Sequence, residues 1–158
     1  MRWSRGSRPQ ASSGGHVLDE KDPPSFRHPR LTDLLGCADF GAGEVLRLVA
    51  SAERVLDGPL ASAIVEAARE RGIRMSRPTV FEHTPGEGIH AVVDGHELWI
   101  GSKAFAGPHG FTDAPDEVIA RHAAAGKTAL VVVIDGRPGA VLAVAGVPRG
   151  GGDGRIVR

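Results

Sequence analysis

Hydrophobic residues recur at helical spacing in two successive stretches of the first half of the chain. From Gly43 onward they fall three and four positions apart, which predicts an amphipathic helix. A second helix is predicted to begin at Pro59, because the missing N–H of proline costs nothing in a first turn, and to stop at Gly72. The short link between them predicts an antiparallel helical hairpin. The expected buried positions are Val45, Leu48, Val49, Ala52 and Leu56, then Leu60, Ile64, Ala67 and Ala68.

The hydrophobic period changes to two in the second half of the chain, which predicts β-strands. Asp94-Gly95 is a two-residue hairpin signal, and counting back from it pairs Val93 with His96 and Ala91 with Leu98. Ile89, Ala91, Val93, Leu98 and Ile100 then share the expected core face. A second hairpin is predicted at Asp135-Gly136. The predicted strands lie in 79–83, 88–101, 128–136 and 138–146, and 31–35 is a candidate for another.

A further helical pattern, residues 113–126, separates the two hairpins. Hairpin-joined strands beside a helical hairpin predict an α+β domain: an antiparallel sheet of about six strands, with the helical hairpin and the further helix packed on it. The domain is expected to span residues 30–146. The glycine- and arginine-rich ends lack periodicity, so 1–29 is expected to be a disordered or poorly packed lead-in and 147–158 a flexible tail.

Composition and charge narrow the function classes. The chain of 158 residues has 19 Lys and Arg against 19 Asp and Glu, which argues against nucleic acid as a partner. No apolar run approaches the roughly 20 residues of a membrane span, and no apolar stretch follows the N-terminal arginines as in a secretory signal. Cys37 is the only cysteine, so no internal disulfide forms. No membrane insertion is expected.

Two tempting motifs fail on geometry. His90 and His96 are predicted to lie on opposite faces of the sheet, so they cannot chelate one metal ion together, and no metal site is expected. The Gly126-Lys-Thr end of a phosphate-binding loop lacks the required earlier glycine, where Arg121 stands, and runs from helix to strand instead of strand to helix. Gly126 is therefore expected to end a helix.

Three other features carry little weight singly. The sequence "PGEGI" places Gly86 and Gly88 just before a strand, where two glycines allow a tight turn or the approach of a ligand to bare backbone. Asp57-Gly58 precedes Pro59, as a helix cap would. Glu53, five residues before Gly58, taken alone is an ordinary helix charge.

In order along the chain, however, these pieces resemble the nucleotide-binding domain of heavy-metal-transporting P-type ATPases. The runs "GEVLRLVASAERVLDGPLASAIVEAARERGI", "PGEGIHAVVDGHELWIGS" and "GKTALVVVIDG" carry the resemblance, which covers residues 30–146. In that family the domain holds ATP over an aspartate that becomes phosphorylated. Its signature is a Glu followed, five residues on, by His-Pro.

The resemblance implies a site when it is carried over residue by residue. Glu53 matches the glutamate that helps recognise adenine, and Gly86 and Gly88 match the glycines that line the nucleotide pocket. Gly101 falls where the family has the glycine of Gly-Asn. Gly58 stands where the family has its histidine, so ATP affinity is expected to be weak, with Mg²⁺ bound only as part of MgATP.

The family's phosphorylation motif, "DKTGTLT", is missing upstream of the domain. Without an acceptor aspartate no phosphoenzyme forms, so no residue is expected to be catalytic and the chain alone is not expected to be active. The expected function is ATP binding as a stand-alone or truncated domain, cytoplasmic, with an intact P-type ATPase or its phosphorylation domain as candidate partner. The alternatives are a non-catalytic interaction module with a decayed nucleotide site and a remnant of a disrupted pump gene.

Overall fold

Six strands form one sheet in the part of the chain that a computed structural model describes, residues 28–37 and 39–147. The strand order is β1-β6-β5-β4-β3-β2, and every neighbouring pair is antiparallel. This confirms the predicted sheet; the candidate strand at 31–35 is its edge strand β1. The expected lead-in and tail fall almost entirely outside the described residues. The strands are β1 Arg30–Gly36, β2 Val80–Thr84, β3 Gly88–Val93, β4 His96–Gly101, β5 Thr128–Ile134 and β6 Arg137–Ala145.

Both predicted two-residue turns are present. Asp94 and Gly95 have φ of 49° and 83°, and Asp135 and Gly136 have φ of 53° and 76°. Positive φ at both central residues is the turn type whose twist matches that of the flanking strands. The register of β3 and β4 is the predicted one, with Val93 opposite His96 and Ala91 opposite Leu98.

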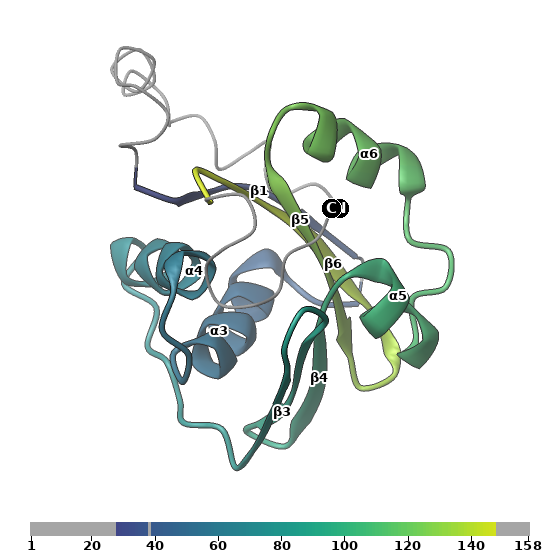
Figure 1. The fold of residues 1–158 in the computed structure, drawn as a ribbon. Coiled ribbons are helices and arrows are strands. Elements are labelled where there is room, and N and C mark those ends of the chain that lie inside the picture. Colours follow the sequence, from purple (N-terminus) through teal and green to yellow (C-terminus); the bar gives the residue numbers. More distant parts are fainter. Residues whose placement is uncertain (1–27, 38, 148–158) are drawn as a thin grey trace.

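The predicted helical hairpin covers one face of the sheet (Figure 1). Its helices are α3 (Ala42–Glu53) and α4 (Pro59–Glu70), and Gly72, with φ of 69°, follows the second as expected. Helix α3 contacts β1, β3 and β4, and α4 contacts β1 and β6. The predicted strand positions are fully buried beneath this hairpin: Ile89, Ala91, Val93, Leu98 and Ile100.

Three short helical segments lie on the other face (Figure 1). They are α5 (Lys103–Ala106), η2 (Gly107–His109) and α6 (Asp116–Ala124). Only α6 is predicted by the sequence pattern, because segments of three and four residues are too short to show a period. The Trp99 ring stacks on His109 at 3.5 Å between centroids and on His90 at 4.0 Å, which fastens η2 to the sheet.

Two glycines allow an unusually close approach between β3 and β4. Gly88 pairs with Gly101 in the register. A Cβ on Gly88 would overlap the Ile100 carbonyl oxygen and come within 2.6 Å of the Phe105 ring. A Cβ on Gly101 would overlap the Glu87 carbonyl oxygen. Both positions therefore exclude side chains for reasons of packing alone.

A partly buried ion pair joins the edge strand to the start of β5. Lys127 Nζ lies 3.1 Å from Asp33 Oδ1, and the Thr32 hydroxyl donates to the same oxygen at 2.7 Å. Burial raises the pKa of Asp33, but the hydrogen bonds from Thr32 and Lys127 outweigh it and hold the pKa below its usual value. The Lys127 ammonium group is therefore paired with a carboxylate of the sheet edge, which gives this lysine a structural role.

Replacing Gly88 with alanine should lower the free energy of unfolding by roughly 1–3 kcal/mol or more, because the new methyl group overlaps backbone that cannot move away cheaply. Urea unfolding measures the loss. Gly43→Ala is the matched control: a Cβ there meets nothing within 4 Å, so its stability should stay within about 1 kcal/mol of the parent. Equal stability of Gly88→Ala would contradict the close approach.

Stability should depend on pH through Asp33. Its pKa is lowered in the folded state, so its contribution is complete above the unfolded pKa and is lost as the pH falls through the folded pKa. Urea midpoints measured from pH 6 to pH 2.5 should therefore fall less steeply for Asp33→Asn than for the parent below about pH 4. Parallel curves would show that the pair contributes nothing.

Candidate functional site

Glu53 is the last residue of α3, and its side chain is fully buried. Its carbonyl oxygen accepts a hydrogen bond from the Leu56 backbone N–H at 2.9 Å, which turns the chain toward α4. Burying a carboxylate is costly unless polar partners compensate. The exposed helix charge suggested by Glu53 taken alone is therefore wrong, because its side chain is enclosed by the protein.

Gly58 caps the start of α4 with a backbone that other residues rarely adopt. Its φ is 133° and its ψ is 165°, and its carbonyl oxygen accepts from the Ser62 N–H at 2.9 Å. This conformation is essentially confined to glycine. No side chain caps the helix, and Asp57 is exposed, so the Asp57-Gly58 pair acts here through the glycine backbone.

The three remaining predicted glycines lie together at one edge of the sheet, where β2 ends, β3 begins and β4 ends. Gly86, with φ of 82°, makes the turn between β2 and β3, in which the Glu87 N–H donates to the Thr84 carbonyl at 2.9 Å. Gly88 follows at the start of β3, opposite Gly101 at the end of β4. Turn geometry accounts for Gly86, which is exposed, and close packing accounts for Gly88 and Gly101, which are buried.

One residue near this turn was missed by the sequence patterns. His83 of β2 pairs with Ile89, one residue beyond Gly88. Its Nε2 atom is buried and has no hydrogen-bond partner among the described residues. Only the pairing of β2 with β3 places it here, and no motif spacing reports that pairing.

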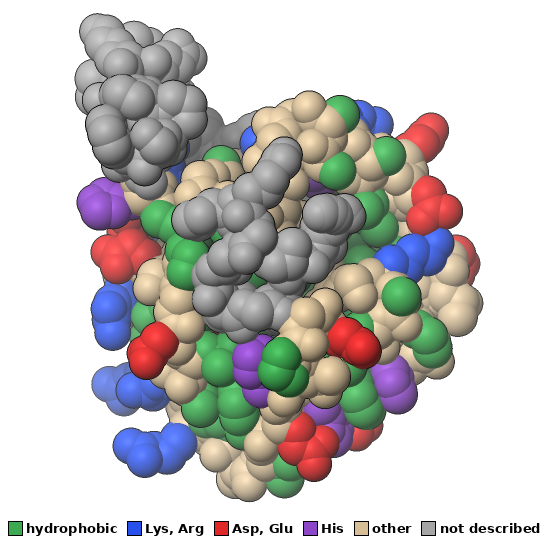
Figure 2. Space-filling view, viewed as in Figure 1, with side chains coloured by type: hydrophobic (Ala, Val, Ile, Leu, Met, Phe, Trp, Pro, Cys, Tyr) green, Lys and Arg blue, Asp and Glu red, His purple; other side chains and the backbone are tan. Residues whose placement is uncertain are grey.

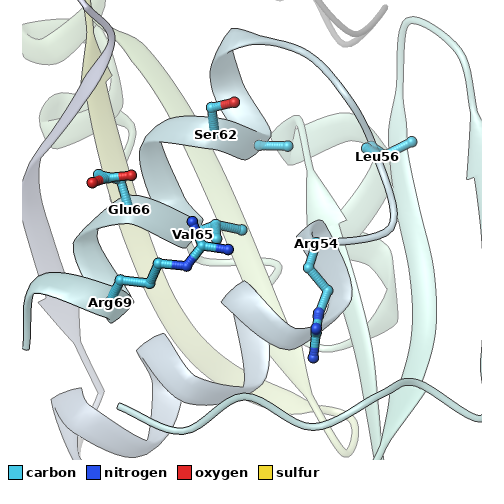
Figure 3. A pocket seen from close by; sticks show the side chains of 7 residues that line it. Arg54, Leu56, Ser62, Val65, Glu66 and Arg69 are labelled. Atoms are coloured by element: carbon cyan, nitrogen blue, oxygen red, sulfur yellow. The ribbon is translucent and has the colours of Figure 1, made fainter. Parts of the chain in front are cut away.

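A shallow hollow of about 280 Å³ lies on the helical hairpin, beside the link that joins Glu53 to Gly58 (Figure 3). Side chains from α4 and from the end of α3 line it: Arg54, Leu56, Ala61, Ser62, Val65, Glu66 and Arg69. On the face shown in Figure 2, several Lys and Arg side chains gather along the lower left edge, while most Asp and Glu side chains lie elsewhere. The charged residues of the hollow are Arg54, Arg69 and Glu66.

Within residues 28–37 and 39–147, no group of three or more His, Cys, Asp and Glu side chains is arranged to hold a metal ion. His90 and His96 lie on opposite faces, as predicted: His90 Nε2 lies 2.8 Å from Glu97, and His96 Nδ1 lies 2.6 Å from Asp135. None of the helices in the described part is long and apolar enough to cross a bilayer.

The sequence of this chain is similar to those of metal-transporting ATPases. It is 41% identical over 130 residues to "Copper-transporting ATPase 1" of Rhizobium meliloti (strain 1021), which covers 81% of the chain but 16% of that protein. It therefore spans about a sixth of that relative. No family model matches.

Solved structures narrow the likeness to one domain. The N-domain of a copper-transporting P-type ATPase matches 75% of the chain and 99% of its own length, at 27% identity and a TM-score of 0.62. A zinc-transporting P-type ATPase in a phosphate-bound state matches 73% of the chain and 19% of its own, at 28% identity and a TM-score of 0.63. The shared unit is thus one domain of a much longer protein.

Gly58→Ala should destabilise the free protein by about 1–3 kcal/mol, because alanine is strained at φ 133° and ψ 165°. Denaturant unfolding measures the change. Gly43→Ala serves again as control, since Gly43 does not have a positive φ. Unchanged stability of Gly58→Ala would show that the turn before α4 relaxes freely.

Proposed function

Because the chain belongs to the nucleotide-binding domains of heavy-metal-transporting P-type ATPases, we propose that it holds ATP for the phosphorylation chemistry of such a pump. One observation carries the proposal: the chain spans 16% of a full-length relative yet matches 99% of an isolated N-domain. What the chain shares with these pumps is their nucleotide-binding unit. We place this unit on the cytoplasmic side of the membrane, where the family holds its ATP.

The contribution of this domain is positioning. Glu53 would recognise the adenine base, and its burial favours this role because a desolvated carboxylate forms stronger hydrogen bonds. The exposed backbone at Gly86 would let the nucleotide approach closely, and the contact between Gly88 and Gly101 would hold that turn in place. Another domain would supply the nucleophile, and Mg²⁺ would arrive with ATP. Holding the reactants in place converts a bimolecular encounter into a local one.

Gly58 should weaken the site. The family places a histidine there against the base, and a ring contact of this kind is worth about 1–3 kcal/mol. Its loss would reduce ATP affinity by roughly one to two powers of ten. The glycine-only backbone at this position supports the proposal, because the chain follows a path on which histidine would be strained.

A second candidate function follows from the same residue. If the site no longer binds nucleotide, the retained fold would act as a non-catalytic interaction module for an intact P-type ATPase or its phosphorylation domain. The unusual Gly58 favours this alternative, whereas the buried Glu53 favours the first proposal.

Titration of the ¹⁵N-labelled chain with ATP, followed by NMR, tests the proposal. We expect shifts concentrated at Glu53, Gly86 and Gly88 and a dissociation constant about ten- to a hundredfold above that of an N-domain carrying the histidine. Gly58→His should tighten binding relative to Gly58→Ala. This pair is the matched comparison, because both substitutions impose the same backbone strain and only one adds the ring.

Absence of shifts in all three proteins, while their spectra show that they are folded, would remove the ATP-binding proposal and leave the interaction module. Shifts confined to the face of the sheet that carries α5 and α6 would also contradict it, since Glu53 and Gly58 lie on the helical hairpin of the other face.

A further inference from the structure

His83 faces the helical hairpin from the edge of the sheet. Directly opposed residues of antiparallel strands point to the same face. His83 is opposite Ile89, and Phe81 is opposite Ala91; both partners are buried under α3 and α4. Glu82, between them, points the other way and meets His90 at 3.3 Å. His83 therefore lies on the hairpin side, three residues before Gly86.

The imidazole of His83 has an unmet hydrogen-bonding atom. Nε2 is buried without a partner among the described residues, and it is the only such side-chain atom in that part of the chain. An unpaired buried polar atom costs free energy that a phenylalanine in its place would not. Groups of this kind are found where a bound molecule completes the hydrogen bond.

The position of the atom indicates which molecule that is. His83 and Ile89 flank the Gly86–Gly88 turn on its two strands, beside the backbone already assigned to the nucleotide. A purine base offers ring nitrogens and exocyclic groups that can accept from or donate to an imidazole nitrogen. We infer that His83 is a nucleotide-contacting residue of this chain, whose Nε2 hydrogen-bonds to the base beside the Gly86–Gly88 turn. This inference rests on the proposed function.

The test uses the whole chain and needs no variant for its first readout. Long-range ¹H–¹⁵N NMR of the parent protein records the His83 Nε2 resonance with and without ATP. We expect ATP to shift it, because a new hydrogen bond changes the shielding of that nitrogen. His90 is the internal reference, because it lies on the opposite face of the adjacent strand.

The variant His83→Phe keeps a flat ring and removes Nε2. It should be at least as stable as the parent in urea, since no buried atom is left unpaired, yet bind ATP roughly three- to tenfold more weakly. If His83 had only a structural role, the substitution would change stability without weakening ATP binding specifically. His90→Gln is the control variant and should leave ATP affinity unchanged.

The outcomes distinguish this inference from the function on which it rests. If ATP shifts Glu53 and Gly86 while the His83 Nε2 resonance and the affinity of His83→Phe stay unchanged, ATP binding stands and the role of His83 is wrong. If ATP shifts nothing in the parent, both fail together. A resonance that moves, with the loss of affinity in His83→Phe, establishes the contact.

Discussion

The register between β3 and β4 is the constraint on which the rest of the domain depends. It is fixed at one end by the turn at Asp94-Gly95, where both residues have positive φ. A shift of one residue would send Ile89 and Ile100 away from the helical hairpin and separate Gly88 from Gly101. Arg47 of α3 reinforces this end through Asp94, 2.6 Å away. The core and the candidate site therefore share one determinant.

The glycine corner shows how fold and site use the same residues. Gly88 and Gly101 are required by the contact of two backbones and the Phe105 ring, whether or not a nucleotide binds. A domain that had lost its ligand would still keep them. The buried carboxylate of Glu53 is different in kind, because packing alone gives no reason to bury a charge. Its position therefore requires polar interactions in addition to packing.

Periodicity and turn chemistry predicted most of the fold. The hairpin registers followed from Asp-Gly pairs, and the helical hairpin followed from apolar spacing and Pro59. Periodicity did not predict α5 and η2, because they are too short to show a period. The Trp99–His109 stack, between residues ten positions apart, holds η2 against the sheet. The orphan nitrogen of His83 was equally invisible, since it depends on which strand β2 joins.

The backbone at Gly58 also bears on how such a domain changes over time. A conformation confined to glycine couples the residue to the path of the chain, so that neither can be exchanged alone without strain. Any other residue placed at position 58 alone is therefore opposed by backbone strain of about 1–3 kcal/mol. That cost disappears only if the link between α3 and α4 takes a different path, so this residue and the shape of the link are constrained to change together.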